Sequence, residues 1–175
     1  GFVSDESQYC TDVKNPPRDN AELANKMLSD LQHSITHKTG GIFHYEVCNR
    51  DRAIGARLSG EIAKHHGNLG MSEAPITLKL SGVAGQSLGA WNVGGLNLYL
   101  QGDANDYVGK GMCGGKIVIA PGKNAGFIAR DASILGNTCL YGATGGRLFA
   151  AGRAGERFAV RNSGATAVIE GAGDH

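Results

Sequence analysis

The sequence has little of what usually identifies a function. Lys and Arg number 17 against 16 for Asp and Glu, so the overall charge gives no attraction to nucleic acid or to an anionic membrane. Its apolar runs fall short of the roughly 18 residues that a membrane-spanning helix needs. The opening GFVSDESQYC has neither the basic nor the apolar stretch of a secretory signal. We therefore expect a cytoplasmic protein that binds neither nucleic acid nor membrane.

The cysteines are few and scattered. Cys10, Cys48, Cys113 and Cys139 form no CxxC pair, lack iron–sulfur spacing and have no histidine at the spacing of a zinc site. We interpret them as reduced, buried thiols and expect no bound metal. An independent enzyme with Cys113 or Cys139 as nucleophile and a histidine as base has no support in linear spacing. It stays open as an alternative, because residues far apart in a sequence can converge in space.

Glycine, by contrast, is in excess, with 28 of 175 residues, about twice ordinary usage. Few glycines precede Gly67, whereas from Gly82 onward they recur every few residues. The apolar runs between them argue against a low-complexity segment. The chain therefore divides into a lead-in region, residues 1–75, and a glycine-rich region, residues 76–175.

The lead-in region is predicted to contain two helices and a strand that pack on the glycine-rich region. Apolar residues recur every fourth position over residues 23–35, which predicts an amphipathic helix with a capping box at Asp19 and Glu22. The run GIFHYEVC, residues 41–48, mixes aromatic and β-branched residues and favours a strand.

A second helix is predicted from the apolar series over residues 54–62. Asn49 or Asp51 is expected to cap its start. Gly55 and Gly60 fall inside this predicted helix, where glycine is unfavourable. We interpret them as places where the helix backbone packs closely against a neighbour.

Short β-rich runs repeat through the glycine-rich region. ITLKL, LNLYL and KIVIA start at residues 76, 96 and 116, and TCLYG and RFAVR extend the series from 138 and 157. A second series, offset by about half a period, comprises LGAWN, VGKGM, FIARD, RLFAA and TAVIE. A period of about twenty residues leaves no room for helices between strands, so it predicts a mainly β, parallel β-solenoid. Leu78, Leu98 and Val118 are expected to stack as one inward column.

Glycines are expected at the corners of these coils, where turns need positive φ angles or close backbone approach. The structural repeat consists of Gly89, Gly94, Gly95, Gly109, Gly111, Gly114, Gly115, Gly142, Gly145 and Gly146. The GxGxxG spacing at residues 109–114 matches a dinucleotide fingerprint, but that motif needs a following helix and the run KIVIA predicts a strand. We therefore expect no nucleotide or flavin cofactor on this chain.

Long runs of the sequence resemble one known family. GDANDYVGKG at Gly102–Gly111, YGATGGRLFAAGRAGERFAVRNSG at Tyr141–Gly164 and CNRDRAIGARLSGEIAKHHG at Cys48–Gly67 are too particular to be general glycine punctuation. They closely resemble the C-terminal GXGXG domain of the bacterial glutamate synthase large subunit, over nearly the whole chain. The resemblance implies that the solenoid is a right-handed parallel β-helix with coils of about 20 residues.

The resemblance also implies a parent enzyme that makes glutamate from glutamine and 2-oxoglutarate. In that family an amidotransferase domain releases ammonia, a synthase domain carries FMN and an iron–sulfur cluster, and a small FAD-containing subunit oxidises NADPH. None of those catalytic motifs lies in this chain. We therefore expect a noncatalytic structural domain that braces the amidotransferase and synthase domains; the alternative is a stand-alone β-solenoid subunit or binding module.

Two further expectations concern surfaces. The charged stretch with Arg147, Arg153, Arg157 and Arg161 is expected to contact the synthase domain, or else to form a solvated face. The family pattern continues beyond the position of His175, so the last coil of this chain is expected to expose strand edges. Such an uncapped solenoid end predicts self-association.

Overall fold

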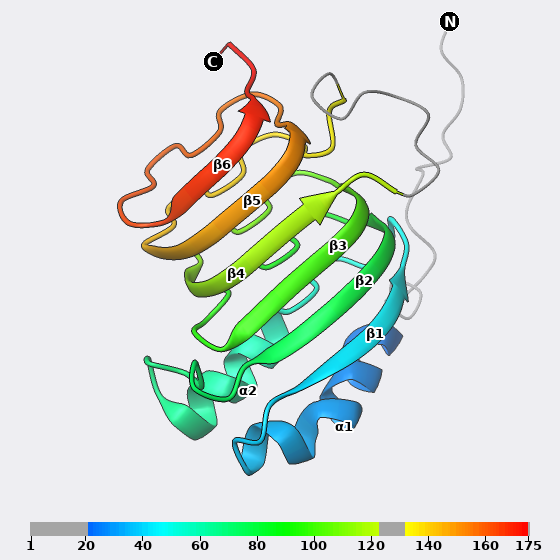
Figure 1. Ribbon diagram of the computed structural model, residues 1–175, viewed down its shortest axis with the longest axis vertical. Coiled ribbons are helices and arrows are strands. Elements are labelled where there is room, and N and C mark those ends of the chain that lie inside the picture. The colour runs from blue at the N-terminus through cyan, green and yellow to red at the C-terminus, as the bar shows by residue number, and fades with distance from the viewer. Residues whose placement is uncertain (1–20, 123–131, 175) are drawn as a thin grey trace, which may run out of the picture.

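The computed structural model describes residues 21–122 and 132–174. Its elements are α1 (Glu22–Thr36), β1 (Gly41–Val47), α2 (Ala56–His66), β2 (Ile76–Ala84), β3 (Leu96–Ala104), β4 (Cys113–Ala120), β5 (Gly145–Arg153) and β6 (Thr166–Gly171). The six strands form one sheet in chain order, and each neighbouring pair is parallel. Figure 1 shows both helices behind the sheet, at its β1 end.

The first helix confirms the pattern of apolar residues at every fourth position. Met27, Leu31 and Ile35 of α1 are buried, and their spacing places them on one face of the helix. Ala21 occupies the N-cap in the left-handed region, with no side-chain capping bond. The predicted capping box includes Asp19, which lies outside the described residues.

The second helix is also confirmed, but its predicted start is wrong. Gly55 is the N-cap residue of α2, and no side chain caps the helix, so neither Asn49 nor Asp51 has that role. A Cβ added at Gly60 would meet nothing within 4 Å, which contradicts the expected close approach at this position. Periodicity located the helix, whereas the details at single glycines depend on neighbours that a sequence does not reveal.

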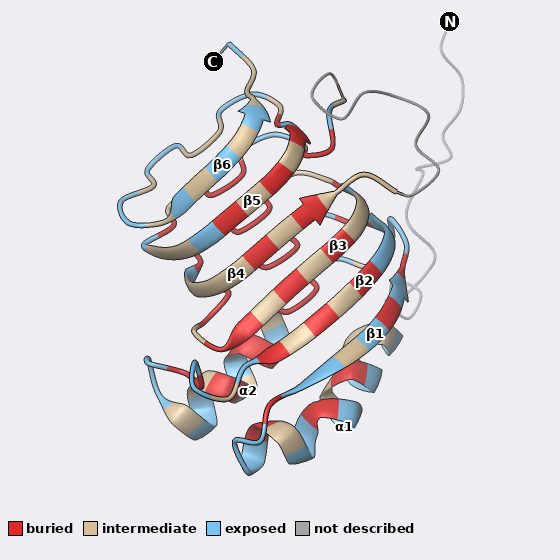
Figure 2. Cartoon of the chain, in the orientation of Figure 1, coloured by how far each residue is buried: buried red, intermediate tan, exposed pale blue. Residues whose placement is uncertain are grey.

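The sheet buries one face through in-register columns of large aliphatic side chains. Leu78 pairs with Leu98, and Leu98 pairs with Ile117. All three are fully buried, and the alternation of buried and partly exposed residues along β2 to β5 is visible in Figure 2. The expected column contained Val118 in place of Ile117, which is wrong by one residue. A one-residue shift moves a side chain to the opposite face of a sheet, so Val118 points outward.

Stacked turns, not helices, connect the strands from β2 to β6 in the described residues. Successive connections donate backbone hydrogen bonds to one another. These run from Ser87 N to Asp106 O, Tyr107 N to Asn137 O, Thr138 N to Glu156 O, Trp91 N to Lys110 O, Gly111 N to Tyr141 O and Gly142 N to Val160 O. Leu88, Val108 and Leu140 project from these turns into the core and are fully buried. The turn layer therefore continues the cover that α1 and α2 begin.

The predicted right-handed parallel β-helix is wrong. The described residues form one open, six-stranded parallel sheet with two helices, which is an α/β-like arrangement. Residues 88–92 and 108–112, expected as strands of a second face, are turns, as are most of residues 138–142 and 157–161. Within these runs Trp91, Leu140 and Ala159 have φ angles of 52°, 58° and 59°, which a strand does not allow. The run FIARD lies outside the described residues.

The two regions distinguished in the sequence share one core. Strand β1, from the lead-in region, pairs with β2 over seven residue pairs, from Gly41 with Ile76 to Val47 with Gly82. A single cluster of buried residues runs from Met27 to Ala154. Neither described helix is both long and apolar enough to cross a bilayer.

Candidate functional site

The repeated glycines lie in the turns and where the strands begin. Gly89 and Gly109 both have a φ of 66°, and a Cβ at either would overlap core side chains, those of Ile117 and Leu140 respectively. Gly111 has a φ of 63° and supports the ring of Trp91, which an added Cβ would contact at 2.9 Å. These positions need glycine both for the backbone conformation and for the close approach of neighbouring groups.

Paired glycines stand where strands β3, β4 and β5 begin, one pair just before β3 and the others within the first residues of β4 and β5. The pairs are Gly94 with Gly95, Gly114 with Gly115 and Gly145 with Gly146. A hollow of about 450 Å³ is bordered by the first two pairs and Gly146, together with Cys113 and Arg147. A Cβ at Gly114 would overlap the Gly94 backbone, so the pairs allow successive strands to start close together.

One buried amide organises this glycine layer. Asn92 is completely buried, and its Nδ2 donates to the carbonyl oxygens of Leu96 at 2.8 Å and Gly114 at 3.0 Å. The amide thus joins the start of β3 to the start of β4. The element that follows Gly111 in the GxGxxG spacing is β4, so no helix N-terminus is available there for a pyrophosphate.

The four arginines predicted as one charged surface lie in different places. Arg147 and Arg153 stand near the two ends of β5, and both are exposed. They are six positions apart along the strand, which corresponds to about 20 Å. Arg157 and Arg161 lie in the turn before β6, where the Arg161 guanidinium is 6.0 Å from the centroid of the Tyr141 ring. Whether any of them contacts another domain stays a proposal.

The described thiols are free but differ in burial. Cys139 is buried, and its burial raises the pKa of the thiol to about 12, which keeps it protonated. Cys48 and Cys113 are exposed, so the expectation of buried thiols is wrong for both. Cys48 Sγ lies 3.2 Å from the Asp51 carboxylate, and Cys113 Sγ lies 3.6 Å from the Asn92 carbonyl oxygen. Cys10 lies outside the described residues.

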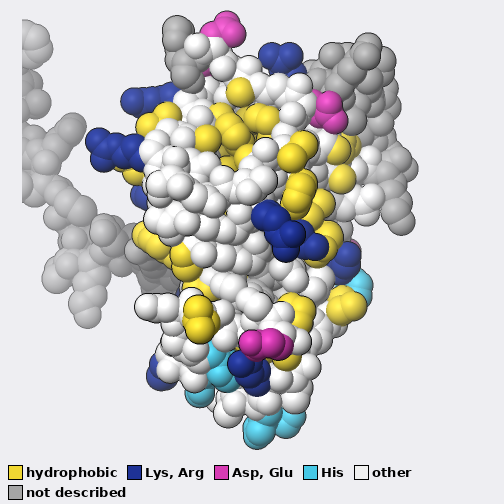
Figure 3. Space-filling view, turned by 60° about the vertical axis from the view of Figure 1, so that its left-hand side comes forward, with side chains coloured by type: hydrophobic (Ala, Val, Ile, Leu, Met, Phe, Trp, Pro, Cys, Tyr) yellow, Lys and Arg dark blue, Asp and Glu magenta, His cyan; other side chains and the backbone are white. Residues whose placement is uncertain are grey.

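Among the described histidines, His33, His37, His65 and His66 lie in the last turns of the helices or just after them, whereas His44 lies on β1. The His33 and His37 rings are 4.3 Å apart, and His65 Nε2 lies 3.7 Å from the Glu61 carboxylate. Figure 3 shows histidine side chains clustered at the lower end of the molecule. The described ranges contain no group of three or more His, Cys, Asp and Glu side chains placed to hold a metal ion.

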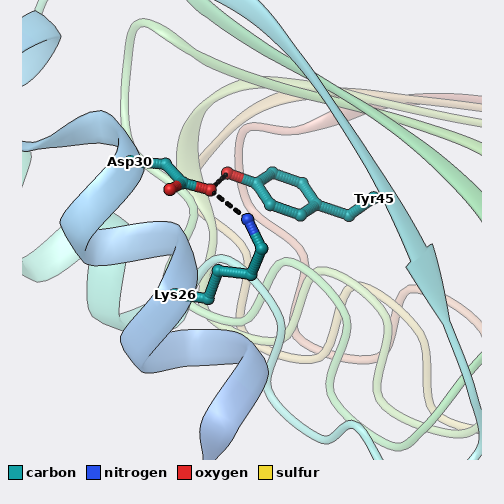
Figure 4. Close-up of polar contacts among 3 residues, drawn as sticks. All are labelled: Lys26, Asp30 and Tyr45. Carbon is teal, nitrogen blue, oxygen red and sulfur yellow. Dashed lines mark hydrogen bonds and ion pairs between the residues drawn. The ribbon is translucent and has the colours of Figure 1, made fainter.

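A polar trio fastens α1 to the edge strand β1 (Figure 4). Tyr45 Oη donates to Asp30 Oδ2 at 2.9 Å, and Lys26 Nζ donates to the same oxygen at 2.8 Å. The hydrogen bond from Lys26, followed by that from Tyr45, lowers the pKa of Asp30. Burial, followed by the Asp30 hydrogen bond, raises the pKa of Tyr45, so its hydroxyl stays protonated at neutral pH. The trio is therefore a structural contact rather than an acid–base pair.

A second hollow, of about 620 Å³, lies between the start of α1 and residues 50–58. Leu23, Met27 and Leu58 give it apolar walls, and Arg50 and Arg52 stand on its border. An apolar lining with positive charge at its border is typical of a site that binds a ligand or a partner rather than of a catalytic site.

The outward face of the sheet was missed by the sequence interpretation. Tyr99, Val118, Phe149 and Val168 are in-register partners on that face. Figure 3 shows hydrophobic side chains gathered with Lys and Arg side chains on the upper part of the molecule. The alternation of residues 116–119 could have indicated this outward row. It does so only when Ile117, rather than Val118, is assigned to the core.

Comparison with known proteins gives a consistent result. The family model described as GXGXG motif matches residues 21–175. The ferredoxin-dependent glutamate synthase 2 of Synechocystis sp. is 62% identical over 146 residues, which cover 83% of this chain and 9% of that protein. Ferredoxin-dependent glutamate synthase 1 of Arabidopsis thaliana is 49% identical over 165 residues, 93% of this chain and 10% of that protein. The glutamate synthase [NADPH] large chain of Azospirillum brasilense is 55% identical over 131 residues, 75% and 9% of the two chains.

The family model matches the whole described part of the chain, whose parallel strands are joined by glycine-containing turns. The chain therefore belongs to the GXGXG motif family. The relatives narrow the assignment within this family, because those described above are all glutamate synthases. The chain corresponds to the GXGXG domain of glutamate synthase large chains, as its resemblance to that domain indicated, and this recognition is confirmed. The chain spans about a tenth of the length of the relatives it matches.

Proposed function

We propose that this chain is a noncatalytic structural domain of a glutamate synthase large chain, in which it braces the amidotransferase and synthase domains. The observation that carries the proposal is strong identity to glutamate synthases over only about a tenth of their length. Most described residues belong to one continuous frame of strands, turns and helices, which suits a supporting role. The lead-in region, residues 1–75, then contributes the helical cover of that frame.

The proposed parent enzyme makes L-glutamate from L-glutamine and 2-oxoglutarate, with FMN and iron–sulfur clusters held elsewhere in the protein. The described residues of this chain do not fit either group. Cys48, Cys113 and Cys139 lie on separate parts of the sheet and its connections, and the glycines at 109–115 lead into a strand. We therefore assign no chemical step to this chain.

The partners proposed are the amidotransferase and synthase domains and, in a holoenzyme driven by NADPH, the small FAD-containing subunit. The relatives at 62% and 49% identity are named ferredoxin-dependent, whereas the relative at 55% is named for NADPH. Both donors therefore belong in any assay. We place the protein in the cytoplasm; several plant relatives are named chloroplastic.

Self-association is also part of the proposal, although its site is an open sheet edge rather than a coil end. Strand β6 has a hydrogen-bonded neighbour in β5 alone among the described strands, and Val168 on it is 57% exposed. Light scattering over a range of concentrations is expected to show dimers or larger species. A monomer at every concentration would remove this part of the proposal.

The noncatalytic role is tested with the purified chain. Glutamine and 2-oxoglutarate are supplied with reduced ferredoxin or with NADPH, and glutamate formation is measured together with flavin and iron absorbance. We expect no turnover and no chromophore. Turnover with either donor, or a bound flavin, would overturn the noncatalytic assignment.

The bracing role is tested in the longest natural polypeptide that contains this sequence. Leu98→Asp places a carboxylate in the fully buried column between β2 and β4 and should unfold the domain. We expect glutamine hydrolysis to become uncoupled from glutamate formation, so that the ratio of the two rises. Gly60→Ala, at an open helix position, is the control and should leave the ratio unchanged. An unchanged ratio in a polypeptide whose domain is demonstrably unfolded by proteolysis would contradict the bracing role.

A further inference from the structure

A row of apolar side chains crosses the outward face of the sheet. Its members, one on each strand from β3 to β6, are Tyr99, Val118, Phe149 and Val168. Lys79, the in-register neighbour of Tyr99 on β2, places Nζ 3.8 Å from the centroid of that ring. This cation–π contact holds the ring at the end of the row. The first three members are half-buried and Val168 is exposed, so the row forms a flat apolar strip on the face opposite the core.

Beside this strip stand two like charges. Lys116 on β4 and Arg147 on β5 are in-register partners, and side chains at such positions are about 5 Å apart at their bases. Their charges repel, which costs the sheet stability. Neither side chain makes an ion pair with another residue in the described ranges. Glu170 on β6 lies four residues beyond the in-register partner of Arg147, about 13 Å further along the strand.

Arg147 of this pair also borders a recess. Arg147 lines the hollow of about 450 Å³ at the strand starts, together with the exposed Cys113 and with Asn97, the in-register partner of Lys116 on β3. An apolar strip, two cations without a carboxylate partner among the described residues and an adjoining recess therefore lie on one surface, which we name the cationic sheet face; Lys116 Nζ also lies 5.1 Å from the centroid of the Tyr99 ring. It is defined by Tyr99, Lys116, Val118, Arg147, Phe149 and Val168.

We propose that the cationic sheet face docks onto a surface of the remaining glutamate synthase polypeptide that carries carboxylates beside apolar side chains. This inference rests on the proposed function. A carboxylate placed between Lys116 and Arg147 would relieve their repulsion, and the apolar strip would be removed from water in the same contact. Charge complementarity thus sets the chemistry of the partner.

The identity of the occupant follows from chain length. Matched relatives extend about tenfold beyond the segment that this chain covers, so most of such a polypeptide lies outside it. A surface on the same polypeptide meets this face at high effective concentration, which favours it over a separate protein of equal complementarity. Arg147 is thereby the one arginine of the predicted stretch that belongs to the interface.

Lysine labelling in the full-length glutamate synthase polypeptide tests the docking. The rate at which a small acylating reagent modifies Lys116 is followed by mass spectrometry in the wild type, in Arg147→Glu and in the matched control Arg153→Glu. The control removes an exposed arginine near the other end of the same strand. We expect Arg147→Glu to speed labelling of Lys116 by about tenfold and Arg153→Glu to leave it unchanged, because only the first substitution repels the docked carboxylates.

The sign of the effect makes the test decisive. In an undocked domain, Arg147→Glu gives Lys116 an oppositely charged neighbour, which should slow its labelling or leave it unchanged. Slower or equal labelling therefore overturns the docking proposal. If the Leu98→Asp polypeptide is nevertheless uncoupled, bracing stands and only the choice of face fails. If neither variant has any effect, the proposed function fails as well.

Discussion

The helical end of the sheet, around β1, and the turn end, toward β6, cover the same core by different means. At the helical end α1 and α2 supply large side chains, and Leu31 and Ile62 are fully buried. At the turn end backbone packs on backbone, and a Cβ at Gly115 would overlap the carbonyl oxygen of Leu96. Packing at the helical end therefore depends on large side chains, whereas packing at the turn end depends on residues that have no side chain.

This difference teaches that the two ends should respond to substitution in opposite ways. Enlarging a residue should harm the turn end, because close backbone approach leaves no space for a side chain. Shrinking a residue should harm the helical end, because it leaves a cavity between packed helices and sheet. Four substitutions, in order of decreasing effect, put this contrast to the test.

The largest effect is expected at the turn end from Gly115→Ala. Gly115 has a φ of 71° and lies against the Leu96 carbonyl oxygen and the Asn92 amide. Backbone strain and overlap together should lower the free energy of unfolding by about 4 kcal/mol or more. Urea unfolding of the chain measures this.

The matched control for that substitution is the same change at the helical end. Gly60→Ala in α2 meets open space, so it should raise the free energy of unfolding by about 0.5–1 kcal/mol. Equal effects of the two substitutions would break the contrast between the ends.

The next effect belongs to the helical end. Leu31→Ala in α1 removes a fully buried side chain and should cost about 3 kcal/mol through lost burial and the cavity left behind. Thermal or urea unfolding gives the value. Leu69→Ala, at a side chain that is 88% exposed, should change stability by less than about 0.5 kcal/mol. A cost below that level at Leu31 would show that the helices are not essential to the core.

Asn92→Ala sharpens the account of the turn end, because it removes a donor without adding volume. The carbonyl oxygens of the buried Leu96 and the half-buried Gly114 both lose the Asn92 amide. Leaving them unsatisfied should cost about 2 kcal/mol. Asn97→Ala on the outward face is the comparison and should be nearly neutral. A neutral result at Asn92 would mean that the glycine turns hold their stacking through backbone bonds alone.

The smallest effect is expected at the trio that ties α1 to β1. Tyr45→Phe removes the hydroxyl that donates to Asp30 and should lower the melting temperature by about 2 °C at pH 7. The lowered pKa of Asp30 means that its contribution is present above the pKa of the unfolded carboxyl and is lost as the pH falls through the folded value. The difference between variant and wild type should therefore shrink as the pH falls through the lowered pKa of Asp30. A difference that persists below that pKa would show that the hydroxyl stabilises the fold independently of the charge on Asp30.

Sequence patterns predicted the helices, the strand at residues 41–48 and the strand runs that start at residues 76, 96, 116, 147 and 166, because periodicity of burial fixes such elements. The patterns failed where similar mixtures of apolar residues and glycine form turns instead of strands, as around residues 88–91 and 108–111. Leu88 and Val108 are buried as strand residues would be, yet they sit between positive-φ residues that the pattern does not show. Register was the second obstacle, since assigning Val118 to the core hid the outward row. The pair of cations could be recognised only from the register of β4 and β5, because Lys116 and Arg147 are 31 positions apart in the chain.

The constant spacing between strands gives the domain a width that is fixed by its number of strands. Turns on one side and strands on the other repeat together, so the structure cannot lengthen on one side alone without breaking hydrogen bonds. Six strands separate the outer edges β1 and β6 by about 24 Å, in steps of about 4.8 Å. Loss or gain of one strand would move whatever rests on the far edge by one such step, so any distance that the domain sets is adjustable only in whole strands.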